Sequence, residues 1–175
     1  MSMVDDDELL WQQEQLDRLR KEGERIAGLH AAHDFSALRR RLMSRFREVV
    51  VPGLRELGFR GSLPNLYRVR DGLVDVLFLQ FDRYGGGFTV NLGRSPLRMR
   101  DDPSTVRLRS IPFEDRARLT RDTSGIEDRW FRYDEPEGTP EQQQDTAIQE
   151  VASLIESADR WLRTGRPETH IVSNS

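Results

Sequence analysis

The residues of this sequence that offer chemistry are arginines, acids and amides. Lys21 is the only lysine, so 26 of the 27 basic residues are arginine, and cysteine is absent. No thiolate nucleophile or disulfide framework is therefore expected. His30, His33 and His170 fall outside the expected strands, so no activated serine is predicted, and His30 and His33 with Asp34 make a poor metal cage. We expect no catalytic residue, no metal ligand and no cofactor.

Positive charge is concentrated in one segment. Residues 94–121 hold eight arginines and four acids, a net of +4, whereas residues 122–150 hold nine acids and two arginines, a net of −7. Guanidinium groups bind carboxylates and phosphates through paired hydrogen bonds. The two segments can instead fold against each other. A second group of five arginines lies in residues 39–47, on one side of an expected helix.

The whole chain bounds the kind of protein. Its 175 residues suit one domain, and its formal net charge is only −3. No run approaches the ~18 apolar residues of a membrane-spanning helix. Residues 5–8 are all acidic, which is unlike the basic start of a secretory signal. We therefore expect a soluble, cytoplasmic protein without a membrane partner.

Three helices are predicted from apolar spacing. Residues 6–33 form an N-terminal helical arm, which either docks on its own domain or pairs with a second copy as a homodimer. Residues 36–57 form a helix that Pro52 bends and Gly58 ends. Residues 140–163 form the last helix, with Thr139 as its cap. The predicted organisation is an arm over 1–33, one domain over 34–164 and a flexible tail over 165–175.

The middle of the chain is predicted to be antiparallel sheet. Strands over 65–70 and 73–82 flank Asp71-Gly72, a two-residue hairpin turn, and strands over 88–93 and 129–133 follow. The signal is weak over 95–126, where alternation at 106–109 suggests a short strand. The predicted fold class is α+β: an antiparallel sheet of four or more strands packed with a bent helix before it and a C-terminal helix, plus the N-terminal arm.

Strand register decides which side chains share a face. In the first hairpin, Arg68 is expected opposite Asp75. An even-numbered glycine loop in the second hairpin pairs Gln80 with Asn91 and makes one face apolar. The other face then carries Gln80, Asp82, Thr89 and Asn91. Buried amides need hydrogen-bond partners, so the Gln80–Asn91 pair either holds the register or faces a ligand.

Several stretches resemble a known family. They are 51–59, 66–68, 76–80 and 88–93, with the arginine-leucine stretch 116–119 and the tryptophan stretch 128–130 farther on. Over about residues 35–162 the chain resembles the bacterial family called domain of unknown function 4304. The resemblance implies an α+β fold and no established activity. Similar small domains near toxins imply an immunity-type binder, and the family pattern falls on Gln80, Asn91, Arg116 and Trp130.

Three functional hypotheses follow. The first is a non-catalytic interaction module that binds an unknown protein partner on one sheet face. Its candidate binding surface is Gln80, Asp82, Thr89, Asn91, Arg116 and Trp130. The second is nucleic-acid binding through the arginine-rich segments 39–47 and 94–121. The third is an enzyme that holds a small anionic substrate with Arg116 and uses Asp82 as a base.

Overall fold

The core of this computed structural model is one antiparallel sheet with helices on one side. The described residues are 34–83, 85–98, 102–121 and 130–173, with 11, 13, 15–21, 23 and 24. The strands run in the order β1-β2-β3-β4-β5-β7, and β6 pairs with β4. Their bounds are β1 Arg60–Ser62, β2 Asn65–Arg70, β3 Leu73–Phe81, β4 Gly87–Pro96, β5 Arg116–Leu119, β6 Phe131–Arg132 and β7 Ile171–Ser173. The predicted α+β class is confirmed.

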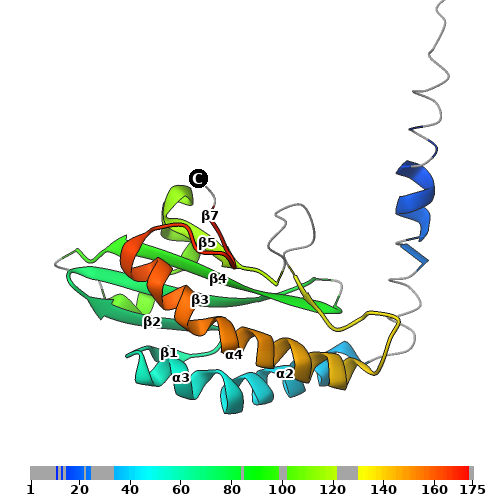
Figure 1. The fold of residues 1–175 in the computed structure, drawn as a ribbon, viewed down its shortest axis with the longest axis horizontal. Helices are drawn as coiled ribbons and strands as arrows, with labels where there is room; N and C mark the ends of the chain where they lie inside the picture. The colour runs from blue at the N-terminus through cyan, green and yellow to red at the C-terminus, as the bar shows by residue number, and fades with distance from the viewer. Residues whose placement is uncertain are drawn as a thin grey trace, which may run out of the picture.

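Helices α2 (Phe35–Val49) and α4 (Pro140–Thr164) lie side by side across one face of the sheet (Figure 1). The Asp34 carboxylate caps α2 by accepting from the backbone N–H groups of Ser36 and Ala37. Pro52 removes a backbone donor, and a separate short helix α3 (Val51–Glu56) follows α2, as the predicted bend requires.

The two long helices are joined by a buried amide. Gln144 of α4 is fully buried, and its side-chain N–H donates to the carbonyl of Leu38 at 3.0 Å. Its side-chain oxygen accepts from Arg41 of α2, also at 3.0 Å. Thr139 and Gln142 form a reciprocal capping box at the start of α4, and Gly165 ends the helix in the left-handed conformation. Hydrogen bonding therefore sets the relative position of α2 and α4.

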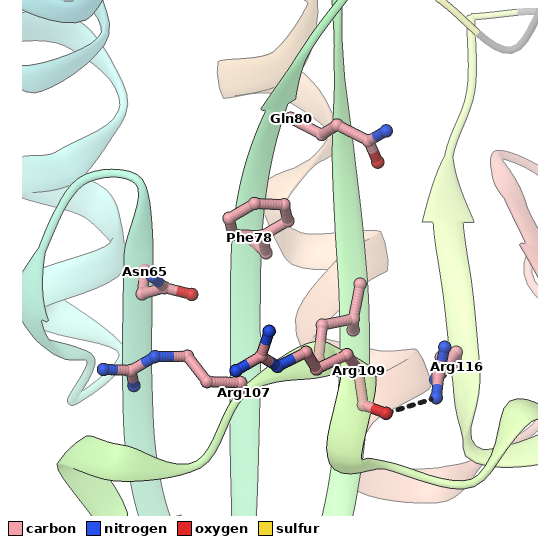
Figure 2. A pocket seen from close by; sticks show the side chains of 7 residues that line it. Asn65, Phe78, Gln80, Arg107, Arg109 and Arg116 are labelled. Atoms are coloured by element: carbon pink, nitrogen blue, oxygen red, sulfur yellow. Dashed lines mark hydrogen bonds between the residues drawn. The ribbon is translucent and has the colours of Figure 1, made fainter.

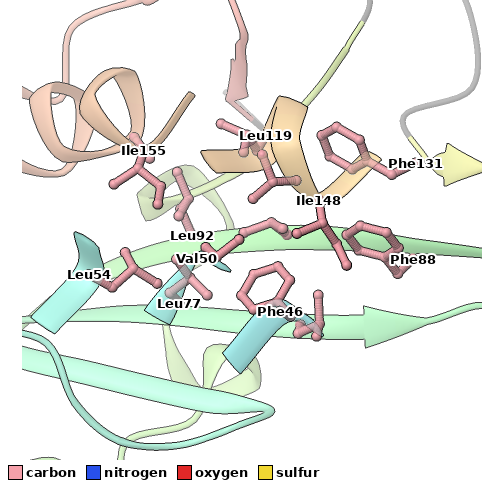
Figure 3. Close-up of a cluster of buried hydrophobic side chains, with 14 of the residues drawn as sticks. Phe46, Val50, Leu54, Leu77, Phe88, Leu92, Leu119, Phe131, Ile148 and Ile155 are labelled. Carbon is pink, nitrogen blue, oxygen red and sulfur yellow. The ribbon is translucent and has the colours of Figure 1, made fainter. Parts of the chain in front are cut away.

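The hydrophobic core fills the space between the helices and the sheet (Figure 3). The rings of Phe88 and Phe131 stack with centroids 5.3 Å apart, and Phe46 of α2 meets Phe88 edge-on at 6.3 Å. Full burial of such a side chain contributes roughly 1.5–3 kcal/mol. Leu77 of β3 and Leu92 of β4 lie on this face, where the sequence predicted the apolar side of the sheet.

An ionic network closes one end of the core. Arg68 and Asp75 are 4 % and 0 % exposed, and their Nε and Oδ2 atoms lie 2.7 Å apart. Arg70 binds the same carboxylate oxygen at 2.7 Å, and Arg68 also lies 2.5 Å from Asp159 of α4. Each charge therefore has an opposite charge beside it, which offsets the cost of burial.

The first hairpin has the predicted register, and the second is shifted. Arg68 lies opposite Asp75, and Asp71 and Gly72 both have positive φ, as a primed two-residue turn requires. In the second hairpin Gln80 pairs with Thr89 instead of Asn91. The pairing is two residues from the prediction because Phe81 already pairs with Phe88, and the chain reverses between them through Gly85 and Gly86, both of which have positive φ. A shift of two residues keeps Gln80, Thr89 and Asn91 on their predicted face, whereas Asp82 lies beyond the end of β3.

Residues 102–115, here called the crossing segment, differ from the sequence prediction. The strand predicted at 106–109 is wrong. The segment instead makes three short 3-10 turns, Pro103–Thr105, Leu108–Ser110 and Phe113–Asp115, and then enters β5. Arginines that alternate with Val106 and Leu108 imitate a strand pattern, whereas Pro103 and Pro112 interrupt strand pairing.

Two further predictions concern the chain ends. The flexible tail predicted over 165–175 contains an ordered strand, because Ile171–Ser173 pair with β5 as β7. In the N-terminal arm, the described residues are helical, and Trp11, Leu16 and Leu19 are exposed. The rest of residues 6–33 lies outside the described residues, and the division into arm, domain and tail stays a prediction.

Candidate binding site

The predicted polar face of the sheet exists, and its amides bind one another. Asn91 of β4 donates from its side-chain nitrogen to the side-chain oxygen of Gln80 at 3.2 Å. Arg118 of β5 donates from Nε to the side-chain oxygen of Asn91 at 3.0 Å. Asn91 therefore uses both ends of its amide within the sheet. It lies between its two neighbouring strands and ties β3 to β5.

Trp130 and Asp82 join this network through arginines. The guanidinium carbons of Arg118 and Arg132 lie 5.9 and 6.0 Å from the Trp130 ring centroid, within cation–π range. Arg132 donates to the Asp82 carboxylate at 2.8 Å. A continuous line of contacts therefore runs from Gln80 to Asp82. Arg118 is central to it, although the sequence reasoning did not single it out.

Burial divides the predicted surface into two parts. Thr89 is 0 % exposed and Asn91 is 5 % exposed, so neither offers area to a partner. Gln80, Arg116 and Trp130 are half-buried. The buried members therefore support the sheet, and contact with a partner falls to the accessible ones.

Gln80 and Arg116 lie at one cavity on the face opposite the helices (Figure 2). Its volume is about 620 Å³, which is within the range of small-ligand and side-chain binding sites. The lining residues come from β2, β3, β5 and the crossing segment; they are Asn65, Phe78, Gln80, Arg107, Leu108, Arg109 and Arg116. In Figure 2 the crossing segment passes across the strands below Phe78 and Gln80.

Apolar packing seats the crossing segment on the sheet. Ile111 is 1 % exposed and packs with Val74 and Val76, which point away from the helices. Gly93 of β4 lies beneath it, and the missing side chain leaves room for Ile111 and Leu108. This small second core fixes the cavity wall that carries Arg107 and Arg109.

Arg116 ties the same segment down with hydrogen bonds. Its Nε donates to the carbonyl of Ile111 at 2.7 Å, and its Nη2 donates to the carbonyl of Arg109 at 3.1 Å and again to Ile111. The hydrogen bonds to Ile111 and Arg109 connect β5 to the crossing segment. Arg116 is thus a positioning residue for the cavity as well as part of its wall.

None of the three cavity arginines forms an ion pair with a described residue, although hydrogen bonds from Ser104 and the charge of Arg107 lower the pKa of nearby Asp102. Arg107 donates from Nη1 to the carbonyls of Ser104 and Val106, and Arg116 donates only to carbonyls. Arg109 is exposed, and its guanidinium has no hydrogen-bond or ion-pair partner within the described part of the chain. Hydrogen bonds to carbonyls do not neutralise a guanidinium charge, and no described acid forms an ion pair with Arg109 or Arg116. The cavity therefore favours an anionic ligand.

The arginines of α2 make a different surface. Arg41 and Arg45 bind the Asp145 carboxylate at 2.7 and 3.1 Å, and Arg39 lies over the Phe81 ring at 4.3 Å. Arg40 and Arg47 line a shallow cavity of about 490 Å³ on this helix. Because α2 covers the opposite face of the sheet, the two arginine-rich segments do not form one continuous surface.

Asp82 belongs to a third cavity, of about 160 Å³, whose lining also includes Arg39 and Tyr133. Burial raises the pKa of Tyr133 to about 12, and the charges of Asp134 and Asp82 add to that effect. Among the described residues that line the larger cavity, Asp82 is not present. The structure therefore does not bring the predicted base Asp82 to the cavity of Arg116.

Asn65 and Phe78 are cavity residues that the sequence reasoning missed. Phe78 lies two residues before Gln80, so strand alternation places it on the same face. Asn65 pairs directly with Phe78 across β2 and β3 in the register that the first hairpin predicted. Both were thus within reach of the sequence. Arg107 and Arg109 were grouped only with the nucleic-acid hypothesis.

Among the described residues, no group of three or more His, Cys, Asp or Glu side chains is placed to hold a metal ion. No helix among them is long and apolar enough to cross a lipid bilayer.

Comparisons with known proteins give one match. A family model described as "Domain of unknown function (DUF4304)" matches residues 50–164, which include every cavity residue. No curated protein and no solved structure matches the chain.

Proposed function

We propose that this chain, which belongs to the DUF4304 family, is a non-catalytic module that binds a protein partner on the sheet face opposite its helices. One observation carries the proposal: Arg107, Arg109 and Arg116 surround a cavity, and none of them forms an ion pair with a described residue. An immunity-type binder is one form of such a module.

The rigidity of the cavity supports binding rather than catalysis. Arg116 is held by backbone carbonyls, and Ile111 is packed over Gly93. The lining offers guanidinium groups, amides and an aromatic ring, with no carboxylate or imidazole for proton transfer among the described residues. Such a surface can hold a partner in one orientation without changing it chemically.

In-cell photocrosslinking tests the proposal. A photoreactive phenylalanine analogue replaces Phe78 in the cavity, and the matched control replaces Phe113, which is 62 % exposed on the crossing segment outside the cavity. We expect one discrete protein adduct from position 78, which Arg109→Glu abolishes. No adduct, or the same adducts from both positions, would contradict the proposal.

Nucleic-acid binding remains the second candidate, because Phe78 and three arginines combine a ring for stacking with charges for phosphate. The α2 arginines do not extend this surface, since they lie on the other side of the sheet. A nuclease-sensitive adduct from position 78 would favour this candidate over a protein partner.

A further inference from the structure

We infer that the partner presents an acidic peptide segment, with an apolar side chain among its carboxylates, to the cavity of Arg107, Arg109 and Arg116. This inference rests on the proposed function and adds the chemistry of the ligand. Three observations carry it: the guanidinium groups left for a ligand, the apolar and amide lining, and the charge of the rest of the chain.

The cavity arginines keep hydrogen-bond donors available. All five N–H groups of Arg109 are without a partner in the described part of the chain, and Arg107 uses only its Nη1. Nε and Nη2 of one guanidinium form the planar edge that binds a carboxylate with two parallel hydrogen bonds. Arg109 and Arg107 therefore each present a complete edge of this kind. The Nε of Arg116 is already bound to Ile111, so its remaining role is charge.

The rest of the lining suits a peptide. Phe78 and Leu108 supply apolar surface, on which an aromatic or aliphatic side chain can pack. Asn65 supplies an amide that can both donate to and accept from a peptide backbone. Gln80 keeps its side-chain nitrogen for the ligand, because the described residues bind only its oxygen, through Asn91. A volume of about 620 Å³ accommodates a few side chains rather than a whole domain.

The charge of the whole molecule argues against a long polyanion. The formal net charge is −3 and the sequence pI is about 5.7, whereas domains that bind nucleic acid through charge are commonly basic. The positive charge at the cavity is local, and the α2 arginines do not continue it. A short segment with a few carboxylates needs only this local positive charge.

Fluorescence anisotropy with defined probes tests the inference on the full-length protein. The first probe is a labelled peptide, Gly-Gly-Glu-Glu-Phe-Glu-Glu; the others carry glutamine for glutamate, or alanine for phenylalanine. A labelled twelve-residue oligo-dT is the polynucleotide probe. We expect the acidic phenylalanine peptide to bind most tightly. Its affinity should fall as the salt concentration rises.

Variants locate the binding. Arg109→Ala should lower the affinity for the acidic peptide by about tenfold or more, because the paired, charge-assisted hydrogen bonds of Arg109 are lost. Arg109→Lys should recover part of the affinity, because it restores charge without the planar edge. Arg40→Ala, which removes an exposed arginine from α2, is the matched control and should leave the affinity for the acidic peptide unchanged.

Three outcomes overturn the inference. In the first, the acidic peptide binds no better than its glutamine analogue. In the second, Arg40→Ala lowers the affinity for the acidic peptide as much as Arg109→Ala does. In the third, oligo-dT binds more tightly and depends on Arg109. If peptide binding fails while the protein adduct from position 78 persists, the acidic segment is refuted and the proposed function stands.

Discussion

Gly93 of β4 and Ile111 of the crossing segment share a space that only glycine leaves open. A Cβ atom at Gly93 would lie 2.6 Å from Cδ1 of Ile111 and 2.9 Å from Cδ1 of Leu108. Both distances are shorter than any ordinary contact between carbon atoms. This close approach lets the crossing segment lie flat against the sheet, and so it determines where Arg107 and Arg109 stand.

The variant Gly93→Ala should therefore disturb the cavity from beneath. We expect a loss of about 1–3 kcal/mol in the free energy of unfolding, typical of overpacking a filled site. The acidic peptide should also bind more weakly, because the wall that carries Arg109 moves. Urea unfolding followed by circular dichroism measures the first effect, and anisotropy measures the second.

Gly53→Ala is the matched control for that variant. Gly53 lies in helix α3, and among the described residues its Cβ would meet only Cδ1 of Ile155 in α4, at 3.9 Å, which is an ordinary contact. Alanine favours the helical conformation, so we expect stability to be unchanged or raised by up to about 1 kcal/mol. Equal losses in the two variants would refute the seating of the crossing segment on Gly93.

The network of Asn91 predicts a separation between stability and binding. Asn91→Ala removes a 5 % exposed amide and leaves Gln80 and Arg118 without their shared partner. We expect a cost of about 1–3 kcal/mol. Arg109→Ala should change stability by no more than about 0.5 kcal/mol, because Arg109 is exposed and bonds nothing in the described structure. Thermal melts of both variants measure this difference in stability loss. An Asn91→Ala protein as stable as the parent would contradict the prediction.

The buried ion pair predicts the largest single loss. Asp75→Asn removes the carboxylate charge that Arg68, which is 4 % exposed, shares with Arg70. Among the described residues, Arg68 then keeps only Asp159 as an acidic partner. We expect a loss of about 3–5 kcal/mol. Glu168→Gln breaks the exposed pair with Arg160 and should cost less than about 1 kcal/mol. Urea unfolding of the two variants compares them, and similar costs would show that the buried network does not hold this end of the core.

The bridge between α2 and α4 predicts a dependence on pH. Burial raises the pKa of Asp145, but the hydrogen bonds from Arg41 and Arg45 outweigh burial, so the pKa is lowered overall. A carboxyl whose pKa is lowered in the folded state stabilises the protein at pH values above its pKa in the unfolded chain, about 3.9. This stabilisation is lost as the pH falls through the folded-state pKa. The advantage of the parent over Asp145→Asn should therefore shrink below about pH 4.

Urea unfolding of both proteins between pH 7 and pH 3 measures this difference. Asp145 is 40 % exposed, so solvent screens the interaction and the effect should be modest. A stability difference that stays constant over the whole range would contradict the assignment.

Local signals predicted the first hairpin and the helix ends well. Asp71 and Gly72 allow essentially one tight turn, so the pairing of Arg68 with Asp75 followed from the sequence. The second hairpin was harder, because Gly85, Gly86 and Gly87 permit several loops of even length. Alternation fixed the faces of its strands, but the exact pairing of Gln80 depended on where β4 begins.

The cavity could not be predicted as a whole, because its wall has no periodic pattern. The crossing segment is held by one buried side chain, Ile111, and by carbonyl bonds from Arg116. Neither is visible as a repeat in the sequence. In the sequence Gly93 resembles an ordinary residue of a strand motif. The structure shows that a glycine is needed there because the side chain of Ile111, eighteen residues later, occupies the space, and local propensity does not predict this contact.

The most direct measurement is an NMR titration of the full-length protein with the acidic phenylalanine peptide, which follows arginine Nε–Hε and side-chain amide signals. We expect saturable shifts at Arg109 and Arg107 and at the side-chain amide of Gln80, with the α2 signal of Arg40 unmoved. Shifts centred on Arg40, or no shift at Arg109 at saturating peptide, would contradict this prediction.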